Sequence, residues 1–441
     1  MARSVGIIGA GQAGIVLGAE LLRRGFAVTL YSDRTPEDYL ADRGRPTACL
    51  FGEQVVHERE LGLNFWEGTA PSIERIHLDL CAPDKLILFS VIASPRLPAL
   101  AVDQRLKFSR GLRELAARGA SVVVEKVSVE RLDALAAEHD LAVVTVGHGG
   151  GPSLFARDPA RSVLDRPRRN VFMVNIRDYD LAAGVGHKQL KFSFVPGVVE
   201  MFWVPFLDKD AGVCLSIVLE AVPGGAADRF TAVESADQGV DVLRGLVRDL
   251  LPWEARFLAP ASATSPVTWL TGAITPTVRD PVARLPSGRH VLGLGDAVIL
   301  NDPLAGQGAN NATRMARFFA ERLEERGDEA FGADWLASTF DQFWAYGRFV
   351  NLFSNAMLEP LAGFQRELLL AASRHPDIGT AFFDGFGDPT ALFPWFAEPG
   401  AARAFLREHG VRGSDLLRYK LGVARKVIGH KIASGAAYSR A

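Results

Sequence analysis

The sequence has few cysteines and almost no net charge, and each scarcity excludes a class of protein. Three cysteines occur among the 441 residues, at Cys49, Cys81 and Cys214, and none is paired at a metal-ligand spacing. We therefore expect them to pack as small apolar residues in a reducing cytoplasm, and we expect no metal site. The 49 basic and 51 acidic side chains leave a net charge of −2, which disfavours a general nucleic-acid-binding protein.

Membrane and export signals are also lacking. No run approaches the ~20 apolar residues that cross a bilayer, and the first residues lack a charged segment followed by an apolar stretch and a cleavage site. We therefore expect a soluble, cytoplasmic protein. A chain of 441 residues exceeds one ordinary core, so two or three lobes are expected.

Residues 4–31 have the pattern of a buried strand, a glycine turn, a helix and a second strand. Gly9, Gly11 and Gly14 match G-x-G-x-x-G. In this motif the first glycine forms a tight turn, the second lets a pyrophosphate approach the backbone, and the third lets the helix pack on the strand. Because the helix start presents free amides and the positive end of its dipole, the pattern predicts a dinucleotide site.

An acid usually follows the second strand of such a unit and binds the ribose. Here the strand at residues 27–31 is followed by Ser32 and Asp33. If Ser32 takes the acid's position, the ribose loses a charge-assisted hydrogen bond and the dinucleotide is held more loosely. Asp33 could serve instead, and the sequence leaves this register open.

A second signature lies at residues 289–312. Residues 291–294 predict a buried strand that brings Asp296 to its carboxyl end, where open α/β sheets bind ligands. Asp296 could accept a hydrogen bond from a sugar-alcohol hydroxyl. The loop at residues 302–308 leads into a helix from Ala309, whose start offers amides to an electron-rich ring edge. By itself, such a Gly-Asp pair before a helix is also typical of an ordinary helix cap.

The rest of the chain predicts an interrupted α/β lobe, an inserted sheet and a helical end. Residues 35–70 look irregular because they contain several prolines and glycines. A hairpin is expected at residues 75–93, followed by a helix at 103–115 and strands at 120–125 and 140–147. The inserted sheet is expected to contain antiparallel strands at 171–176, 189–195, 199–206 and 213–220, with a helix at 240–251 and a further strand near 267–274.

With both motifs in this order, the chain resembles flavoprotein monooxygenases of the para-hydroxybenzoate hydroxylase fold over about residues 1–350. Within that group it is most similar to the FAD-dependent epoxidase subunit of two-component styrene and indole monooxygenases. The family also has a small hydroxyl residue where Ser32 stands. The segments that carry the resemblance are 6–14, 28–34, Arg43, 140–147, 293–296 and 302–310.

The resemblance implies an α/β fold in three parts. A Rossmann-like FAD-binding domain would comprise residues 1–72, 100–168 and 275–335. A substrate domain with an inserted antiparallel sheet would comprise residues 73–99 and 169–274, and a helical C-terminal region would follow at 336–441.

The resemblance also implies an activity. Reduced, exchangeable FAD from a separate NAD(P)H-dependent flavin reductase would react with O2 to give a C4a-peroxide adduct, which epoxidises or hydroxylates an apolar aromatic substrate similar to styrene or indole. A single-component hydroxylase, a flavin halogenase and a noncatalytic flavin-binding sensor remain alternatives. A homodimer also remains open. The segment Met201–Phe206 lacks the second tryptophan of the halogenase signature.

Site residues follow from the same resemblance. Gly9, Gly11 and Gly14 would hold the pyrophosphate, Ser32 or Asp33 the ribose, and Asp296 the ribityl chain. The residues expected to flank or border the flavin ring are Arg43, Arg105, Pro303, Gly306, Gly308, Ala309 and Asn310, with Thr47, Pro303 and Asn310 at the reacting face. The two arginines could instead form ordinary ion pairs. Beside Thr47, Pro46, Leu50 and Phe51 depart from the family pattern, which leaves the substrate open.

Two further segments have alternative interpretations. The aromatic residues of the inserted sheet, Phe192, Phe194, Phe202 and Trp203, would cover the substrate or form ordinary core. Residues 416–432 are basic with helical apolar spacing, and they could dock on a partner or an anionic surface, or pack locally as a solvated helix.

Overall fold

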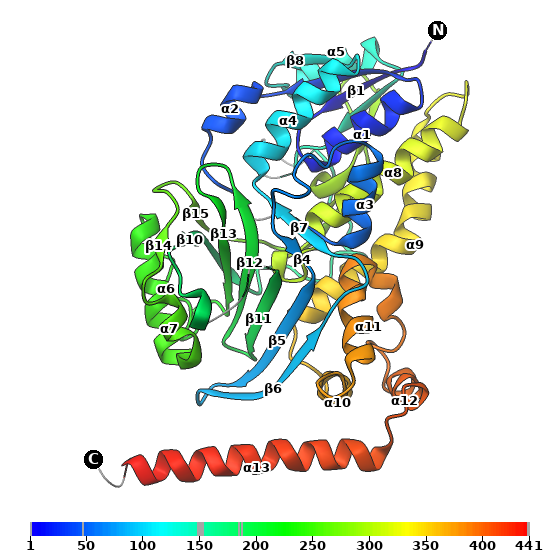
Figure 1. Cartoon of the computed structure of the whole chain (residues 1–441). Coiled ribbons are helices and arrows are strands. Elements are labelled where there is room, and N and C mark those ends of the chain that lie inside the picture. The colour runs from blue at the N-terminus through cyan, green and yellow to red at the C-terminus, as the bar shows by residue number, and fades with distance from the viewer. Residues whose placement is uncertain (1, 46–47, 148–153, 184–185, 187, 439–441) are drawn as a thin grey trace. The chain divides into compact units, whose positions relative to one another are not determined.

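The computed structural model describes residues 2–45, 48–147, 154–183, 186 and 188–438 (Figure 1). It divides into two compact units. Unit 1 comprises Met1–Glu67, Val102–Arg168 and Ile274–Asn355, and unit 2 comprises Gly68–Ala101, Arg169–Ala273 and Ala356–Ala441. None of the helices in the described ranges combines the length and the apolar character that crossing a bilayer requires.

Unit 1 is built on a mostly parallel sheet of six strands. Its order is β17 (Val282–Arg284), β18 (His290–Gly293), β9 (Leu141–Val144), β1 (Ser4–Ile8), β2 (Ala27–Ser32) and β8 (Ser121–Val124). Only β17 runs antiparallel to its neighbour. This sheet confirms the predicted Rossmann-like organisation, with β1 paired in parallel to both β2 and β9.

Apolar strands and helices account for this arrangement. The central strand β1 carries Val5 and Ile7, which are fully buried, because helices cover parallel sheets on both faces. The helix α1 (Gln12–Arg23) contributes Leu17 and Leu21 to the same core. Unit 1 also contains the helices α4 (Gln104–Ala117), α5 (Val129–Glu138), α8 (Gln307–Glu325) and most of α9 (Ala333–Met357).

The prediction that residues 35–70 are irregular was wrong for two helices, α2 (Pro36–Ala41) and α3 (Gly52–Glu60). Thr35 and Asp38 form a capping box at the start of α2, and Pro36 occupies its first turn. A proline there needs no amide partner, so it begins the helix instead of breaking it.

Unit 2 contains the predicted inserted sheet. Its strand order is β14 (Ser262–Ala263), β10 (Asn170–Arg177), β13 (Gly212–Ala221), β12 (Val199–Asp208), β11 (Gln189–Val195), β5 (Arg75–Ala82) and β6 (Leu86–Ala93). The predicted hairpin is β5 and β6, and it joins the insert through a parallel pairing of β5 with β11. The strand β15 (Trp269–Ala273) pairs with β10. The helices α6 (Ala236–Leu250) and α7 (Ala255–Leu258) contribute to the core that contains β10, β12 and β13.

The predicted helical end is present. Unit 2 contains α10 (Gly363–Ala372), α11 (Pro376–Gly387), α12 (Pro399–Glu408) and α13 (Gly413–Tyr438). The contact pattern therefore divides residues 336–441 between the two units at Asn355, and they do not form a third compact unit.

Candidate functional site

The glycine motif forms a tight turn between β1 and α1. Gly9 has φ +114°, a region that favours glycine, and the oxygen of Gly9 would lie 1.9 Å from a Cβ added at Gly14. Thr145, at the end of β9, fixes this turn because its Oγ1 donates to the carbonyl oxygens of Ile8 and Gly9 at 3.1 and 2.9 Å. A Cβ added at Gly11 would meet no atom within 4 Å. Gly11 therefore presents bare backbone to open space.

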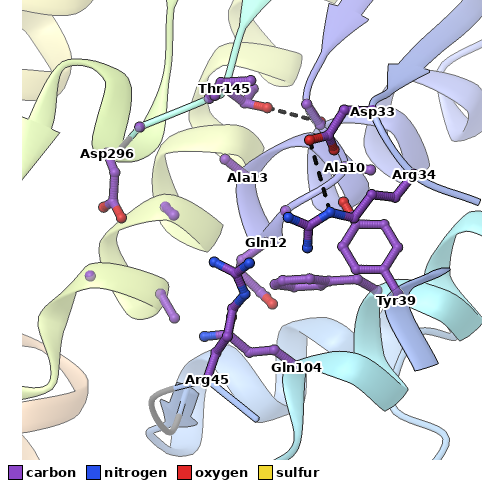
Figure 2. Close-up of a pocket in the computed structure, with 18 of the residues that line it drawn as sticks. Ala10, Gln12, Ala13, Asp33, Arg34, Tyr39, Arg45, Gln104, Thr145 and Asp296 are labelled. Atoms are coloured by element: carbon purple, nitrogen blue, oxygen red, sulfur yellow. Dashed lines mark hydrogen bonds and ion pairs between the residues drawn. The ribbon is translucent and has the colours of Figure 1, made fainter. Parts of the chain in front are cut away.

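That open space is a cavity of about 330 Å³ in unit 1. Its walls come from the turn before α1, the loop after β2, the start of α4, the loop after β9 and the start of α8. Figure 2 shows its principal side chains, among them Gln12, Asp33, Tyr39, Arg45, Thr145 and Asp296.

The starts of two helices contribute to this cavity. Ala13 at the start of α1 and Gly308 and Ala309 at the start of α8 line it. Neither helix has a side-chain cap on its N-terminal amides, and neither has an acidic residue in its first turn. Such helix starts favour an anion, because the first amides of a helix have no acceptor within the helix and the helix dipole is positive there. The cavity therefore fits the pyrophosphate of a dinucleotide.

Two carboxylates lie on different sides of the cavity. Asp33 follows β2, and Asp296 follows β18 (Figure 2). Asp296 packs closely on Gly147, where an added Cβ would lie 2.5 Å from the Cβ of Asp296. Ser32 is buried, and its hydroxyl donates to the carbonyl oxygen of Arg34 at 2.7 Å. The structure thus resolves the register that the sequence left open: Asp33 lines the cavity, and Ser32 closes the local turn.

The side of the cavity near Asp33 is cationic and aromatic. Asp42 binds both Arg34, at 2.5 Å, and Arg45, at 2.9 Å. Burial alone would raise the pKa of Asp42, but the hydrogen bond and charge of Arg45 lower it below its usual value. Tyr39 packs edge to face on Phe108 with ring centroids 5.7 Å apart, and burial raises its pKa. This flat apolar surface beside positive charge suits a nucleotide base and its phosphate.

Of the two predicted arginines, one lines the cavity and the other does not. Arg105 is buried and lines the cavity, and its Nη2 lies 2.6 Å from Oδ2 of Asp103. Arg43 is exposed and is absent from the cavity wall, where Arg45 stands instead. Sequence reasoning missed Arg45 because the resemblance pointed two residues earlier, and its proximity to Asp42 becomes visible only in the folded loop.

A buried polar network also has no counterpart among the sequence motifs. Lys107 of α4 donates to Glu58 of α3 at 2.6 Å, and both are buried. The amide nitrogen of Gln12 donates to Glu58 at 2.8 Å and to Thr313 of α8 at 2.9 Å. Because both amide protons are used in this way, the oxygen of Gln12 remains as an acceptor in the cavity wall. No spacing in the sequence joins these four positions.

A second buried ionic cluster lies further along α1. Glu20 is fully buried, its Oε1 lies 3.0 Å from Nε2 of His57, and its Oε2 accepts a hydrogen bond from Arg24. Burial alone would raise the pKa of Glu20, but the hydrogen bonds and charges of His57 and Arg24 outweigh it and lower the pKa to about 2. This carboxylate stays ionised and contributes to the packing of α1 on α3.

The segment predicted to border the flavin ring separates into two groups. Gly308 and Ala309 line the cavity, whereas Pro303, Gly306 and Asn310 are absent from its wall. Asn310 is buried. Its Oδ1 accepts from the amide of Phe51 at 2.9 Å, and its Nδ2 donates to the carbonyl oxygens of Cys49 and Gly306 at 2.9 and 2.7 Å.

These contacts make Asn310 a positioning residue that ties the start of α8 to β3 (Ala48–Leu50), and they give no support to a direct role at the reacting face. The predicted catalytic residue Thr47, with its neighbour Pro46, lies outside the described residues. A catalytic role for Thr47 or Pro303 therefore stays a prediction.

The four aromatic residues predicted to cover the substrate lie on two faces of the sheet in unit 2. Phe192 pairs with Phe202 across β11 and β12, with ring centroids 4.9 Å apart, and Phe194 lies 6.3 Å from Phe202. Trp203 is fully buried and packs on Phe257 of α7 at 5.5 Å.

Trp203 therefore cannot line a pocket with the three phenylalanines, which corrects the predicted grouping. The signal was present in the sequence, because consecutive residues of a strand point to opposite faces.

Comparisons with known proteins agree with this geometry. Residues 147–256 match the family model described as "Styrene monooxygenase A putative substrate binding domain". Styrene monooxygenase StyA of Pseudomonas fluorescens is 27% identical over 410 residues, which cover 90% of this chain and 96% of that protein. The StyA of a second Pseudomonas strain has the same identity and coverage.

Solved structures show the same fold at low sequence identity. A variant of the flavin-dependent brominase Bmp2 aligns with a TM-score of 0.60 and 13% identity, covering 92% of this chain and 99% of its own. The Pseudomonas aeruginosa protein pqsL, described as a probable FAD-dependent monooxygenase, aligns with a TM-score of 0.57 and 15% identity, covering 87% of this chain and all of its own. The chain is thus similar over nearly its whole length to styrene monooxygenase StyA, and it shares the fold of these flavin-dependent enzymes.

Proposed function

We propose that the protein is the oxygenase component of a two-component system, which uses reduced FAD and O2 to oxygenate an apolar aromatic substrate similar to styrene or indole. In the overall reaction one atom of O2 enters the double bond of the substrate and the other leaves as water, with two electrons drawn from reduced FAD. The observation that carries the proposal is the cavity at Gly11, where the uncapped starts of α1 and α8 contribute to one wall.

Different residues of the cavity would bind different parts of FAD. Amides at Gly11 and Gln12 would bind the pyrophosphate, and Asp33 would accept hydrogen bonds from the adenosine ribose. Tyr39 would pack on the adenine, and Asp296 would accept from the ribityl hydroxyls. Bound reduced FAD supplies the activation of O2, so the chain's own task is to hold the cofactor, orient the substrate and exclude water.

In this proposal the substrate would pack on the sheet of unit 2, whose candidate aromatic side chains Phe192, Phe194 and Phe202 are buried in the chain by itself. Phe192, Phe194 and Phe202 form one contiguous aromatic cluster on one face of β11 and β12, and Phe386 of α11 adds a fourth ring 5.8 Å from Phe192. Aromatic side chains of this kind pack on a flat hydrocarbon with little desolvation cost. This chemistry favours styrene-like or indole-like molecules over charged substrates.

Weak binding of FAD would fit a separate reductase. The carboxylate that would bind the ribose is that of Asp33, whose side chain is 55% exposed, while the buried neighbour Ser32 carries no charge. An exposed carboxylate binds a hydroxyl weakly, because water competes with it and salt screens it. FAD can therefore exchange between this chain and an NAD(P)H-dependent flavin reductase. We place the enzyme in the cytoplasm, where NAD(P)H is available.

The test supplies reduced FAD enzymatically, from a flavin reductase with NADH, to the purified chain with styrene, indole and larger aromatic alkenes under isotopically labelled O2. We expect an epoxide or hydroxylated product that contains one labelled oxygen, and no product from NADH without the reductase. Turnover with NADH alone would refute the two-component assignment. Halide-dependent halogenation, or flavin binding without any oxygenated product across the panel, would refute the oxygenase assignment.

A further inference from the structure

The last helix of unit 2, α13, exposes a stripe of large aliphatic side chains. Leu417, Leu421, Ile428 and Ile432 are 60%, 50%, 58% and 67% exposed. Their spacing of four, seven and four residues places them within about 60° of the helix circumference and along ~22 Å of its length. We call these four residues the outer stripe. Monomeric proteins rarely line up exposed aliphatic residues in this way unless the surface binds something.

Both halves of α13 are held in place by other residues of unit 2. Tyr419 bonds to His375 at 3.0 Å, and Lys420 forms an ion pair with Glu367. Near the other end, His430 bonds to the carbonyl oxygen of Asp84 at 2.8 Å. The outer stripe is thus presented as a fixed ridge, on a helix whose other side carries these anchoring contacts.

Charge on α13 has one sign around this ridge. Residues 416–434 contain five lysines and arginines and no acidic residue. By helical position, Arg418 and Arg425 lie along one side of the outer stripe, and Lys420 and Lys431 lie along the other. Arg418 forms an ion pair with Asp415 and Lys420 one with Glu367, so Arg425 and Lys431 are the members of the two rows that carry charge without an acidic partner among the described residues. An apolar strip between two rows of long basic side chains is the arrangement of helices that lie in the interface of an anionic membrane.

We propose that the outer stripe of α13 docks the enzyme on an anionic phospholipid surface. A second copy of the chain, docked through the same stripe, would bring Arg425 and Lys431 close to the same two cations of its partner. A protein partner is less well matched, because protein interfaces depend on aromatic anchors in fitted pockets and the stripe has only aliphatic side chains. A planar, negatively charged layer matches both the straight apolar ridge and its basic margins.

Docking would bring the enzyme to the phase in which apolar aromatic molecules dissolve. That benefit rests on the proposed function, whereas docking itself does not. The two can therefore fail separately: vesicle binding requires no turnover, and turnover with styrene in solution requires no vesicle.

The test is co-sedimentation of the full chain with vesicles of phosphatidylglycerol and phosphatidylcholine in equal amounts, compared with phosphatidylcholine alone. We expect binding only to the anionic vesicles, weakened by salt. The double variant Ile428→Gln/Ile432→Gln should bind at least about tenfold more weakly, since it removes half of the apolar stripe. The control Val163→Gln changes a residue that is 69% exposed outside α13, and it should bind as the parent does.

Three outcomes of the vesicle assay would overturn the proposal: no binding by the parent chain, equal binding to both vesicle types, or unchanged binding by the stripe variant. Light scattering without lipid tests whether a second copy of the chain covers the outer stripe instead. A dimer in the parent chain that dissociates in the stripe variant would assign the stripe to that second copy and would also overturn the proposal. Circular dichroism and turnover with soluble reductase should be unchanged in the variants, which separates a docking effect from misfolding.

Discussion

Replacing each of two glycines of the first motif by alanine separates cofactor binding from folding. At Gly11 the backbone is extended, with φ −81° and ψ −169°, and an added Cβ meets no protein atom within 4 Å. At Gly14 the added Cβ would lie 1.9 Å from the carbonyl oxygen of Gly9. We therefore expect Gly11→Ala to weaken FAD binding with little change in stability, and Gly14→Ala to destabilise unit 1.

The expected magnitudes follow from these contacts. The new methyl of Gly11→Ala would displace the pyrophosphate from the amides of α1, and each charge-assisted hydrogen bond lost costs about 1.5–3 kcal/mol, or roughly 10- to 150-fold in Kd. The free energy of unfolding should change by less than about 1 kcal/mol, since alanine adopts this backbone conformation and only the helix cap is altered. Gly14→Ala should lower it by about 1–3 kcal/mol or more through overpacking.

The assay combines a titration of FAD followed by calorimetry with urea unfolding followed by circular dichroism, on the parent chain and both variants. The reasoning is refuted if Gly11→Ala binds FAD as tightly as the parent, because the backbone at that position would then not contact the cofactor. It is equally refuted if Gly14→Ala unfolds at the same urea concentration as the parent.

Three further predictions concern groups away from the glycine turn. Lys107→Met should lower the free energy of unfolding by about 3–5 kcal/mol because it leaves the carboxylate of Glu58 buried without its cation, and adding Glu58→Leu should recover part of the loss in urea melts. Because the folded-state pKa of Glu20 is lowered from 4.5 to about 2, its contribution to stability is complete above about pH 4.5 and is lost as the pH falls toward 2; unfolding of Glu20→Gln should lack this component of the acid dependence. Phe192→Leu should change the KM for aromatic substrates and alter the free energy of unfolding by less than about 1.5 kcal/mol. Trp203→Phe should lower the free energy of unfolding and leave KM unchanged. Steady-state kinetics and urea melts of the two variants measure these effects.

Local patterns in the sequence determine much of the fold. The strands at β1, β2 and β9, the hairpin of β5 and β6 and the insert from β10 to β13 all follow from apolar runs bounded by turn residues. The roles of Gly9 and Gly14 could also be predicted from the sequence. Each depends on a requirement at a single residue, a positive φ at Gly9 and a close approach of the helix to the turn at Gly14.

Contacts between distant residues were decided only by the tertiary structure. Gln12, Glu58, Lys107 and Thr313 are brought together by the packing of four helices, and no spacing in the sequence marks them. The exchange of Arg43 for Arg45 in the cavity wall likewise depends on how one loop turns around Asp42. The sequence by itself thus determined which backbone could cradle a dinucleotide, since that requirement is local. Which side chains complete the site depended on the folded chain, since a buried charge or amide acquires its partner only from segments far away in sequence.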